Sequence, residues 1–234
     1  MIFAGLQKLT TLDYPSKIAC TVFTKGCNLH CPFCHNASLV DTEYSPDYVA
    51  YKEFFDFLES RKGLLDGVVI SGGEPLYWPD TIEAIKEIKR LGFLVKLDTN
   101  GAFPDRLAVA IDAGVDYVAM DIKNSLDKYR MTIGIPGLYA DYKMKFIESI
   151  DIIKQGGIDY EFRTTLVSPL HTINDIKDIA SWIGDKNTKY ALQNYENSGD
   201  ILNDMGFSGF TREEMEEIKD SIKDKFKEVI IRGI

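Results

Sequence analysis

The chain has 234 residues, of which 45% are hydrophobic, and it carries a formal net charge of −9. This apolar share is typical of a packed soluble protein, and the acidic balance argues against nucleic-acid binding, which needs a basic face. The apolar runs fall far short of the roughly 20 residues that cross a bilayer, and the first residues lack the basic start and apolar stretch of a signal peptide. We therefore expect a cytoplasmic protein that binds neither nucleic acid nor membrane.

Short β-rich segments alternate with segments of helical periodicity along the chain. Several of the β-rich segments are continuous apolar runs, as expected where both faces of a parallel sheet are covered. Six such alternations predict a parallel α/β fold, either an open barrel or a doubly wound sheet. The expected strands are 19–23, 67–70, 94–97, 117–121, 160–167 and 190–194. The expected helices are 48–58, 81–91, 104–113, 142–154, 173–183 and 212–226, the last with a capping box formed by Thr211 and Glu214.

No repeat or linker-like change of composition divides the chain. We expect one domain over 1–234, with an N-terminal extension (1–18) and a C-terminal helix–strand segment (about 200–234). That last segment carries little information, and closure of the barrel is its simplest interpretation. In either parallel fold, functional residues collect at the C-terminal ends of the strands.

A loop with three cysteines directly follows the first expected strand. Cys27, Cys31 and Cys34 have C-x3-C-x2-C spacing, and Gly26 and Pro32 oppose a continuous helix, so the loop can curl around one ligand. A four-iron cluster normally takes four cysteine thiolates. This loop provides three, which would leave one iron open to a substrate.

Other interpretations of these residues remain open. Cys31 and Cys34 alone match a thioredoxin-like redox pair, and with His35 they form a haem-attachment pattern. Adding Cys27 instead gives a set of ligands for zinc. The missing export signal weakens the haem interpretation, the redox pair leaves Cys27 without a role, and zinc does not explain the later motifs. Cys20 lies outside the spacing and is expected in the core.

At this loop the sequence resembles the radical S-adenosylmethionine (SAM) superfamily, including the aromatic residue Phe33 before the third cysteine. The resemblance implies one [4Fe–4S] cluster held by Cys27, Cys31 and Cys34. It also implies that SAM binds the open iron through its amino and carboxylate groups. An electron from the reduced cluster would then cleave SAM to methionine and a 5′-deoxyadenosyl radical.

A glycine-rich turn follows the second expected strand. Gly72 and Gly73 let a ligand approach the backbone closely, although such a turn alone is common. Together with Glu74, and placed after the cysteine loop, it resembles the superfamily motif that holds the SAM amino group. His35 and Asn36 complete a Cys-His-Asn sequence shared with activators of glycyl radical enzymes, and this resemblance implies backbone contacts with SAM.

Acidic residues end the third and fourth expected strands. Each acid alone is explained at least as well by a helix cap or a solvated loop charge as by a functional role. Together, Asp98, Thr99 and Asp121 resemble residues of the glycyl radical activators, including the pyruvate formate-lyase activator, that help hold a monovalent cation beside the SAM carboxylate. Oxygen ligands suit such an ion. The same resemblance places Asp121, Ile122 and Lys123 in the SAM site.

Four further residues complete the candidate set. Arg163, on the fifth expected strand, either pairs with the SAM carboxylate or forms a structural ion pair. Glu196 aligns where formate-lyase activators carry a histidine, so we assign it no SAM contact. His30 and His171 are expected to be surface or capping histidines and receive no role.

The stretch 12–23 is similar to the activating proteins of anaerobic ribonucleotide reductase, within a wider resemblance over about 9–199. It implies a partial (β/α)6 TIM-like barrel and an activase that abstracts hydrogen from a glycine of that reductase. A flavodoxin- or ferredoxin-type protein is the implied reductant. No cysteine follows Cys34, so no auxiliary cluster is expected. The alternatives are activation of pyruvate formate-lyase or another glycyl radical enzyme, a small-molecule enzyme such as a 7-deazaguanine-type synthase, and a non-catalytic zinc or redox module.

Overall fold

The computed structural model describes residues 1–45, 47–135, 137, 139–197, 199–203 and 205–234. Its centre is an eight-stranded sheet whose strands follow the order of the chain. The first strand is antiparallel to the second, and every later neighbouring pair is parallel. The strands are β1 (Phe3–Thr10), β2 (Ala19–Thr24), β3 (Gly67–Gly72), β4 (Leu94–Thr99), β5 (Tyr117–Asp121), β6 (Asp159–Leu166), β7 (Lys189–Asn194) and β8 (Glu228–Arg232).

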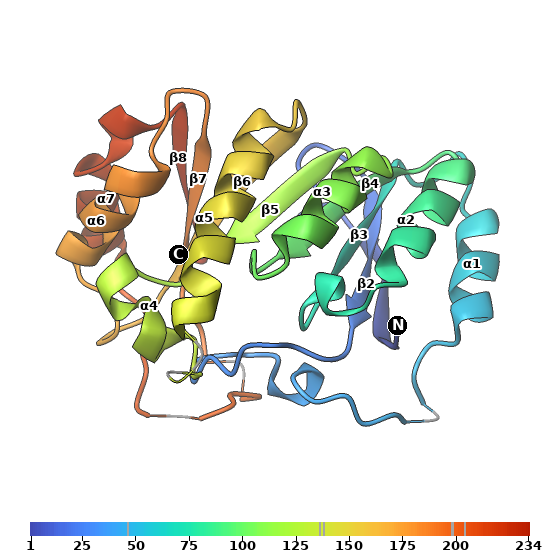
Figure 1. The fold of residues 1–234 in the computed structure, drawn as a ribbon, viewed down its shortest axis with the longest axis horizontal. Coiled ribbons are helices and arrows are strands. Elements are labelled where there is room, and N and C mark those ends of the chain that lie inside the picture. The colour runs from blue at the N-terminus through green and yellow to red at the C-terminus, as the bar shows by residue number, and fades with distance from the viewer. Residues whose placement is uncertain (46, 136, 138, 198, 204) are drawn as a thin grey trace.

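Helices cover the outer face of this sheet (Figure 1). Helix α2 shows how the sequence produces the layer, since Ile85 and Ile88 recur one turn apart and both are fully buried. The longer helices are α1 (Tyr51–Glu59), α2 (Thr81–Arg90), α3 (Pro104–Asp112), α4 (Leu126–Thr132), α5 (Tyr139–Gln155), α6 (Ile173–Ile183) and α7 (Arg212–Asp220). The short 3-10 turns within the described residues are η1 (Ala37–Leu39), η2 (Pro75–Tyr77) and η4 (Lys223–Lys225).

The predicted parallel α/β fold of the partial TIM-barrel type is confirmed, with β2 to β7 at the six expected places. β8 pairs with β7 and extends the sheet. Among the described residues no hydrogen-bonded ladder joins β8 to β1, so the barrel stays open. The structure also adds β1 where only an extension was expected, and α4 where no helix was expected. Both are elements whose sequences carry a weak periodic signal.

Helix α7 begins with the expected capping box. Thr211 Oγ1 accepts a hydrogen bond from the Glu214 backbone nitrogen at 3.2 Å, and the Glu214 carboxylate accepts one from the Thr211 nitrogen at 2.8 Å. The helix ends at Asp220, earlier than the predicted residue 226. The reason is that Ile222 and Phe226 turn into the core, which bends the chain toward β8.

Two apolar clusters fill the protein. The larger lies between the sheet and the helices and includes Cys20, fully buried as expected. The smaller lies on the inner face of the sheet and contains Tyr14 and Tyr117, whose rings are 6.0 Å apart. Because Tyr117 is the first residue of β5, this cluster fills the interior toward the N-terminal ends of the strands. The space that remains lies toward their C-terminal ends.

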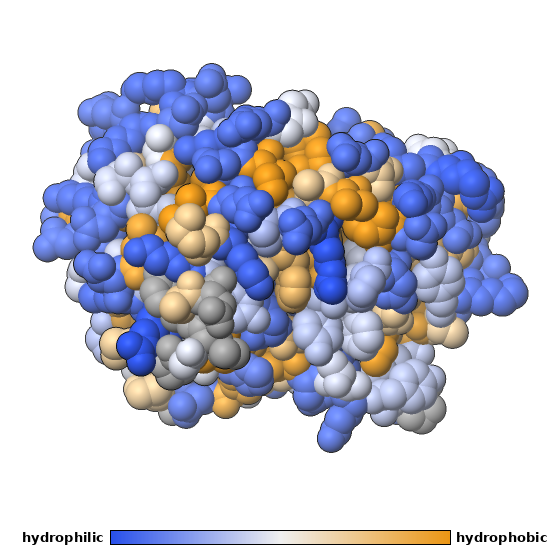
Figure 2. Space-filling view, viewed as in Figure 1, coloured by the Kyte–Doolittle hydropathy of each residue, from blue (hydrophilic) through white to orange (hydrophobic). Residues whose placement is uncertain are grey.

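The outer face formed by the helices is largely hydrophilic, with hydrophobic side chains showing mainly in its upper middle part (Figure 2). None of the described helices combines the length and the hydropathy that a bilayer crossing requires. Below the strands in the same orientation, the loop after β2 and the segment after β7 run close to one another (Figure 1). These two segments form one side of the candidate site.

Candidate functional site

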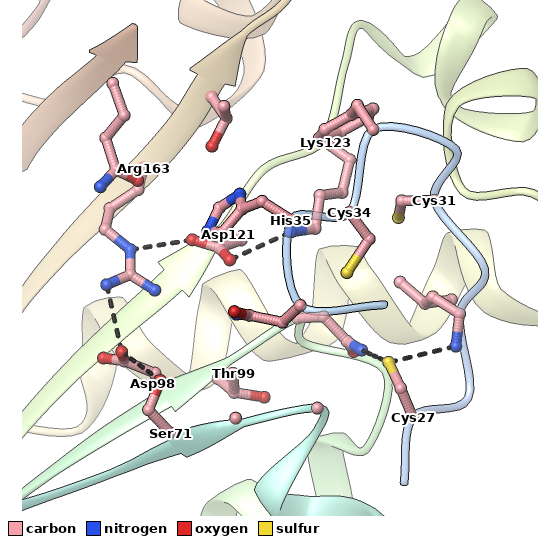
Figure 3. Close-up of a pocket in the computed structure, with 18 of the residues that line it drawn as sticks. Cys27, Cys31, Cys34, His35, Ser71, Asp98, Thr99, Asp121, Lys123 and Arg163 are labelled. Atoms are coloured by element: carbon pink, nitrogen blue, oxygen red, sulfur yellow. Dashed lines mark hydrogen bonds and ion pairs between the residues drawn. The ribbon is translucent and has the colours of Figure 1, made fainter. Parts of the chain in front are cut away.

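A cavity of about 550 Å³ opens at the C-terminal ends of the strands. Figure 3 shows that the thiols of the cysteine loop and the charged ends of β4, β5 and β6 face this space from opposite sides. Candidate residues from separate motifs are therefore brought together. Those that line the cavity are Cys27, Cys31, Phe33, Cys34, His35, Asn36, Gly72, Gly73, Asp98, Thr99, Asp121, Lys123 and Arg163.

Backbone hydrogen bonds fix the base of the cysteine loop. The nitrogen of Gly26 donates to the carbonyl of Leu39 at 2.8 Å, and that of Cys27 donates to Val40 at 2.9 Å. The Glu74 nitrogen donates to the Gly26 carbonyl at 2.8 Å, which attaches the loop to the end of β3. The loop is thus closed on itself and held against the sheet, so its thiols keep their direction toward the cavity.

The thiols lie in a largely apolar wall. Burial raises the pKa of Cys27 to about 12 and that of Cys31 to about 11, so both are neutral until a metal displaces their protons. Two donors already point at the sulfur of Cys27: the Leu29 backbone nitrogen at 3.4 Å and the Asn100 side-chain nitrogen at 3.8 Å. Among the described residues, no three His, Cys, Asp or Glu side chains converge as for one metal ion.

The glycine turn touches the cysteine loop, and both of its glycines are required there. Gly72 has φ of 118°, and a Cβ atom on it would lie 2.3 Å from the carbonyl oxygen of Thr24. A Cβ atom on Gly73 would lie 2.3 Å from the carbonyl oxygen of Gly26. Any larger residue would push the two segments apart. Their backbones therefore form part of the cavity wall itself.

Glu74 and Ile122 were expected at the cofactor, but their side chains do not line the cavity. Glu74 is fully buried and accepts hydrogen bonds from Thr99 Oγ1 at 2.9 Å and from the Asn100 nitrogen at 2.6 Å. Burial raises its pKa to about 7 although these bonds act in the opposite direction. Ile122 is also fully buried, and its nitrogen donates to the Arg163 carbonyl at 2.7 Å. Both residues connect neighbouring strand ends beneath the cavity.

Ion pairs join the ends of β4, β5 and β6. Arg163 Nε donates to Asp121 Oδ1 at 2.8 Å, and its Nη1 lies 3.3 Å from Asp98 Oδ2 (Figure 3). Lys123 Nζ lies 3.0 Å from Asp121 Oδ2, and Lys96 pairs with Asp98. Burial alone would raise the pKa of Asp121, but Arg163 and Lys123 hold it well below its usual range. Charged acids and bases are thus fixed at the cavity wall at neutral pH.

Asp98, Thr99 and Asp121, the residues expected to hold a monovalent cation, all have hydrogen-bond or ion-pair partners within the protein. The hydroxyl of Thr99 donates to Glu74 beneath the cavity and accepts from the Gly101 nitrogen at 3.1 Å. Each oxygen of the two aspartates faces a donor of the protein. These residues therefore lie near one another without presenting a set of free oxygen ligands.

His171 has a structural role that the sequence did not indicate. It is buried, with its Nδ1 accepting from the Val167 nitrogen at 3.1 Å, so its Nε2 carries the proton that is donated to the Lys123 carbonyl at 2.8 Å. Burial lowers its pKa, which keeps the ring neutral. Its ring also meets Phe33 edge-on at 6.4 Å. His171 thus holds the backbone of Lys123 beside the cysteine loop.

The three remaining positions considered in the sequence are His35, Glu196 and His30. His35 lines the cavity, and its pKa is lowered by burial and then by the charge of Lys123. Glu196 is exposed but also lines the cavity, at its mouth. His30 is exposed, as expected, and its backbone nitrogen donates to the Ile133 carbonyl at 3.0 Å.

The segment after β7 fastens the far side of the cysteine loop. The nitrogens of Leu202 and Asn203 donate to the carbonyls of Cys34 and Pro32, each at 3.0 Å. The Asp200 carboxylate accepts from both the nitrogen and the hydroxyl of Ser38. Sequence reasoning missed this role because nothing in the segment itself resembles a motif.

Comparisons with known proteins identify the family of the chain. The sequence profile of the Radical SAM superfamily matches residues 21–183. A protein of Methanocaldococcus jannaschii, provisionally named a glycyl-radical enzyme activating enzyme, is 36% identical over 199 residues, which are 83% of this chain and 80% of that protein. A pyruvate formate-lyase-activating enzyme of Staphylococcus epidermidis is 29% identical over 169 residues, 64% of this chain and 63% of that enzyme.

The fold has a matching solved structure. A radical SAM methyltransferase from Sphaerobacter thermophilus has a TM-score of 0.72 at 14% identity, over 96% of this chain and 68% of that chain. At that identity the match concerns the fold alone. The profile match covers most of the chain and includes all three cysteines of the loop. This chain therefore belongs to the radical SAM superfamily and is an enzyme of that superfamily.

Proposed function

We propose that this enzyme is an activase that uses SAM to remove a hydrogen atom from a glycine of a glycyl radical enzyme, with anaerobic ribonucleotide reductase as the expected partner. The proposal rests on one cavity, in which a three-cysteine loop faces the charged ends of β4, β5 and β6. The relative from Methanocaldococcus jannaschii supports the glycyl radical class of partner. The resemblance of the stretch 12–23 to reductase activators supports the choice of reductase.

Membership of the superfamily implies a [4Fe–4S] cluster and SAM, and the residues present fit both. Cys27, Cys31 and Cys34 would hold the cluster, because they share one cavity wall, whereas Cys20 lies in the core. When bound, the cluster supplies the electron for the reductive cleavage of SAM. The nitrogens of Leu29 and Asn100 that point at the Cys27 sulfur would stabilise its thiolate form.

A cavity of about 550 Å³ suits a small molecule such as SAM. We assign the backbone of Gly72 and Gly73 to the amino group, since no side chain blocks their approach. Lys123 and Arg163 would face the carboxylate, and Asp121 holds both of them in position. The side chain of Phe33 and the backbones of His35 and Asn36, which line the same cavity, would bound the rest of the molecule.

A protein substrate would reach the cavity at its mouth, where Glu196 is exposed. The chain has no cysteine after Cys34 and therefore no source of thiolates for an auxiliary cluster. A single cluster suffices for hydrogen abstraction, with a flavodoxin- or ferredoxin-type protein as the proposed reductant. The fold would position the glycine loop and exclude water and oxygen.

The test is activation of defined partners. The reconstituted protein would be incubated without oxygen with dithionite, SAM and either anaerobic ribonucleotide reductase or pyruvate formate-lyase. We expect a glycyl radical signal in electron paramagnetic resonance with the reductase, together with formation of 5′-deoxyadenosine. The Cys31→Ala variant should give neither signal. Deoxyadenosine without a radical on any glycyl radical enzyme would contradict the activase and favour a small-molecule substrate.

A further inference from the structure

Every carboxylate oxygen at the ends of β4 and β5 already faces a donor of the protein. Asp98 Oδ1 pairs with Lys96, while Asp98 Oδ2 accepts from Ser71 Oγ at 2.9 Å and lies 3.3 Å from Arg163. Asp121 Oδ1 accepts from Arg163, and Asp121 Oδ2 accepts from Lys123. A monovalent metal ion at these acids would have to share their oxygens with nitrogen donors that carry the same sign of charge.

Lys96 is the unusual member of this group. It belongs to β4, only 2% of it is exposed, and its ammonium group reaches Asp98 on the inner face of the sheet. Lysine is almost never buried to this extent unless it is paired, because a buried ammonium group loses its hydration. Its position is therefore determined by the carboxylate of Asp98, two residues further along the same strand.

Cationic groups of the protein already contact both acids directly. The two carboxylates, Asp98 and Asp121, face three cationic groups, on Lys96, Lys123 and Arg163. Adding a metal cation would bring like charges to within a few ångströms of each other in a poorly solvated site, which is unfavourable. Thr99, the third expected ligand, is turned away to Glu74.

We propose that the ammonium group of Lys96 supplies the positive charge that the resemblance assigns to a monovalent cation, and that these acids bind no such ion. The charge is then part of the chain and is present whatever salt surrounds the protein. It holds Asp98 in place beside Arg163, and so positions the cationic wall that faces the SAM carboxylate. This inference rests on the SAM site proposed above.

Two measurements on the reconstituted wild-type protein test it. Sodium NMR line widths would be recorded with and without SAM, and SAM affinity would be measured by calorimetry in potassium chloride and in choline chloride. We expect no protein-dependent sodium broadening and a dissociation constant that agrees between the two salts. Sodium broadening that potassium reverses, or an affinity about tenfold higher in potassium than in choline, would overturn the proposal.

Replacing Lys96 should make SAM binding depend on an added cation. Lys96→Met removes the charge and keeps a chain of similar length, so its SAM affinity should fall about tenfold in choline and recover in potassium, with sodium broadening appearing. Lys89→Met is the matched control, since Lys89 pairs with Asp116 at 2.6 Å away from the cavity. It should behave as the wild type. Unchanged SAM affinity of Lys96→Met in choline would also overturn the proposal.

The outcomes separate this inference from the proposed function. If the wild type binds SAM but depends on potassium, only the role of Lys96 fails. If the wild type does not bind SAM in either salt, the proposed function fails, and the sodium line width still decides whether the acids hold a cation. If Lys96→Met does not fold, the wild-type measurements decide alone.

Discussion

The carboxylate of Asp200 accepts hydrogen bonds from the hydroxyl and the backbone nitrogen of Ser38, 162 positions earlier in the chain, at 2.8 and 3.3 Å. This contact ties the segment after β7 to the turn that follows the cysteine loop. The loop is therefore shaped by residues from both halves of the chain. Its geometry depends on the tertiary fold as well as on its own sequence.

Asp200→Ala should loosen the cysteine loop more than it destabilises the protein. The two hydrogen bonds are exposed, so we expect a loss of about 1 kcal/mol in the free energy of unfolding. Amide hydrogen exchange should become faster at residues 34–40, which the segment covers. Glu216→Ala, which removes an exposed acid of α7, serves as the control. Equal exchange in both variants would show that Asp200 does not restrain the loop.

The cysteines should divide into two classes on replacement. Cys27→Ala, Cys31→Ala and Cys34→Ala should each fail to retain a stable cluster, because the loop then offers too few thiolates. Cys20→Ala should keep the wild-type content, since Cys20 is fully buried in the core. Iron and acid-labile sulfide per chain after anaerobic reconstitution measure this, with about four irons expected for the wild type. Iron loss in Cys20→Ala alone would contradict the assignment.

Glu74 should make the stability depend on pH. Its pKa rises from 4.5 to about 7 on folding, because of its burial, so the folded state holds the proton more tightly than the unfolded state. Stability should therefore fall as pH rises from about 4.5 to 7, by up to about 1.4 kcal/mol per pH unit. The Glu74→Gln variant has no titrating group at this position, so it lacks this pH-dependent contribution to stability. Urea unfolding at several pH values measures the free energy of unfolding of the wild type and of Glu74→Gln. The difference between these two free energies should change between about pH 4.5 and 7 and stay constant above pH 7.

An ion pair between the partly exposed Arg232 and the buried Glu161 attaches β8 to the inner face of the sheet. Arg232 holds both oxygens of Glu161 at 2.9 and 2.7 Å, and only 2% of Glu161 is exposed. Arg232→Met removes the bidentate partner of this buried carboxylate and should lower the free energy of unfolding by about 3 kcal/mol. The double variant Glu161→Met/Arg232→Met should recover most of the loss. Additive losses in a double-mutant cycle would show that the two residues are not coupled.

The sequence predicted the parts of the fold whose signals are local. Several of the strands β2 to β7 are apolar runs, and the three cysteines of the loop lie within eight residues of one another. β1 was missed because it is an edge strand that exposes Gln7, Lys8 and Leu9, and its pairing with β2 is irregular. An exposed, uneven strand lacks the alternation that identifies a buried one.

The site residues that were missed act through partners distant in the chain. Asn100 reaches Cys27, and His171 reaches Lys123, which no single-segment pattern reveals. Lys96 did leave a signal, a charged residue inside the apolar run of β4. Such a residue needs a buried partner, and Asp98 is two positions away on the same face of the strand. The partner that joins the expected cation ligands Asp98 and Asp121, Arg163, comes from another strand, β6.

The contact between Gly73 and Gly26 has a consequence for protein engineering. Because a Cβ atom on Gly73 would lie 2.3 Å from the Gly26 carbonyl oxygen, the two motifs are fitted backbone to backbone. A designer who grafts the cysteine loop onto another barrel must transplant the glycine turn with it. The smallest portable unit of this cofactor site is thus a pair of segments, and neither can evolve independently of the other.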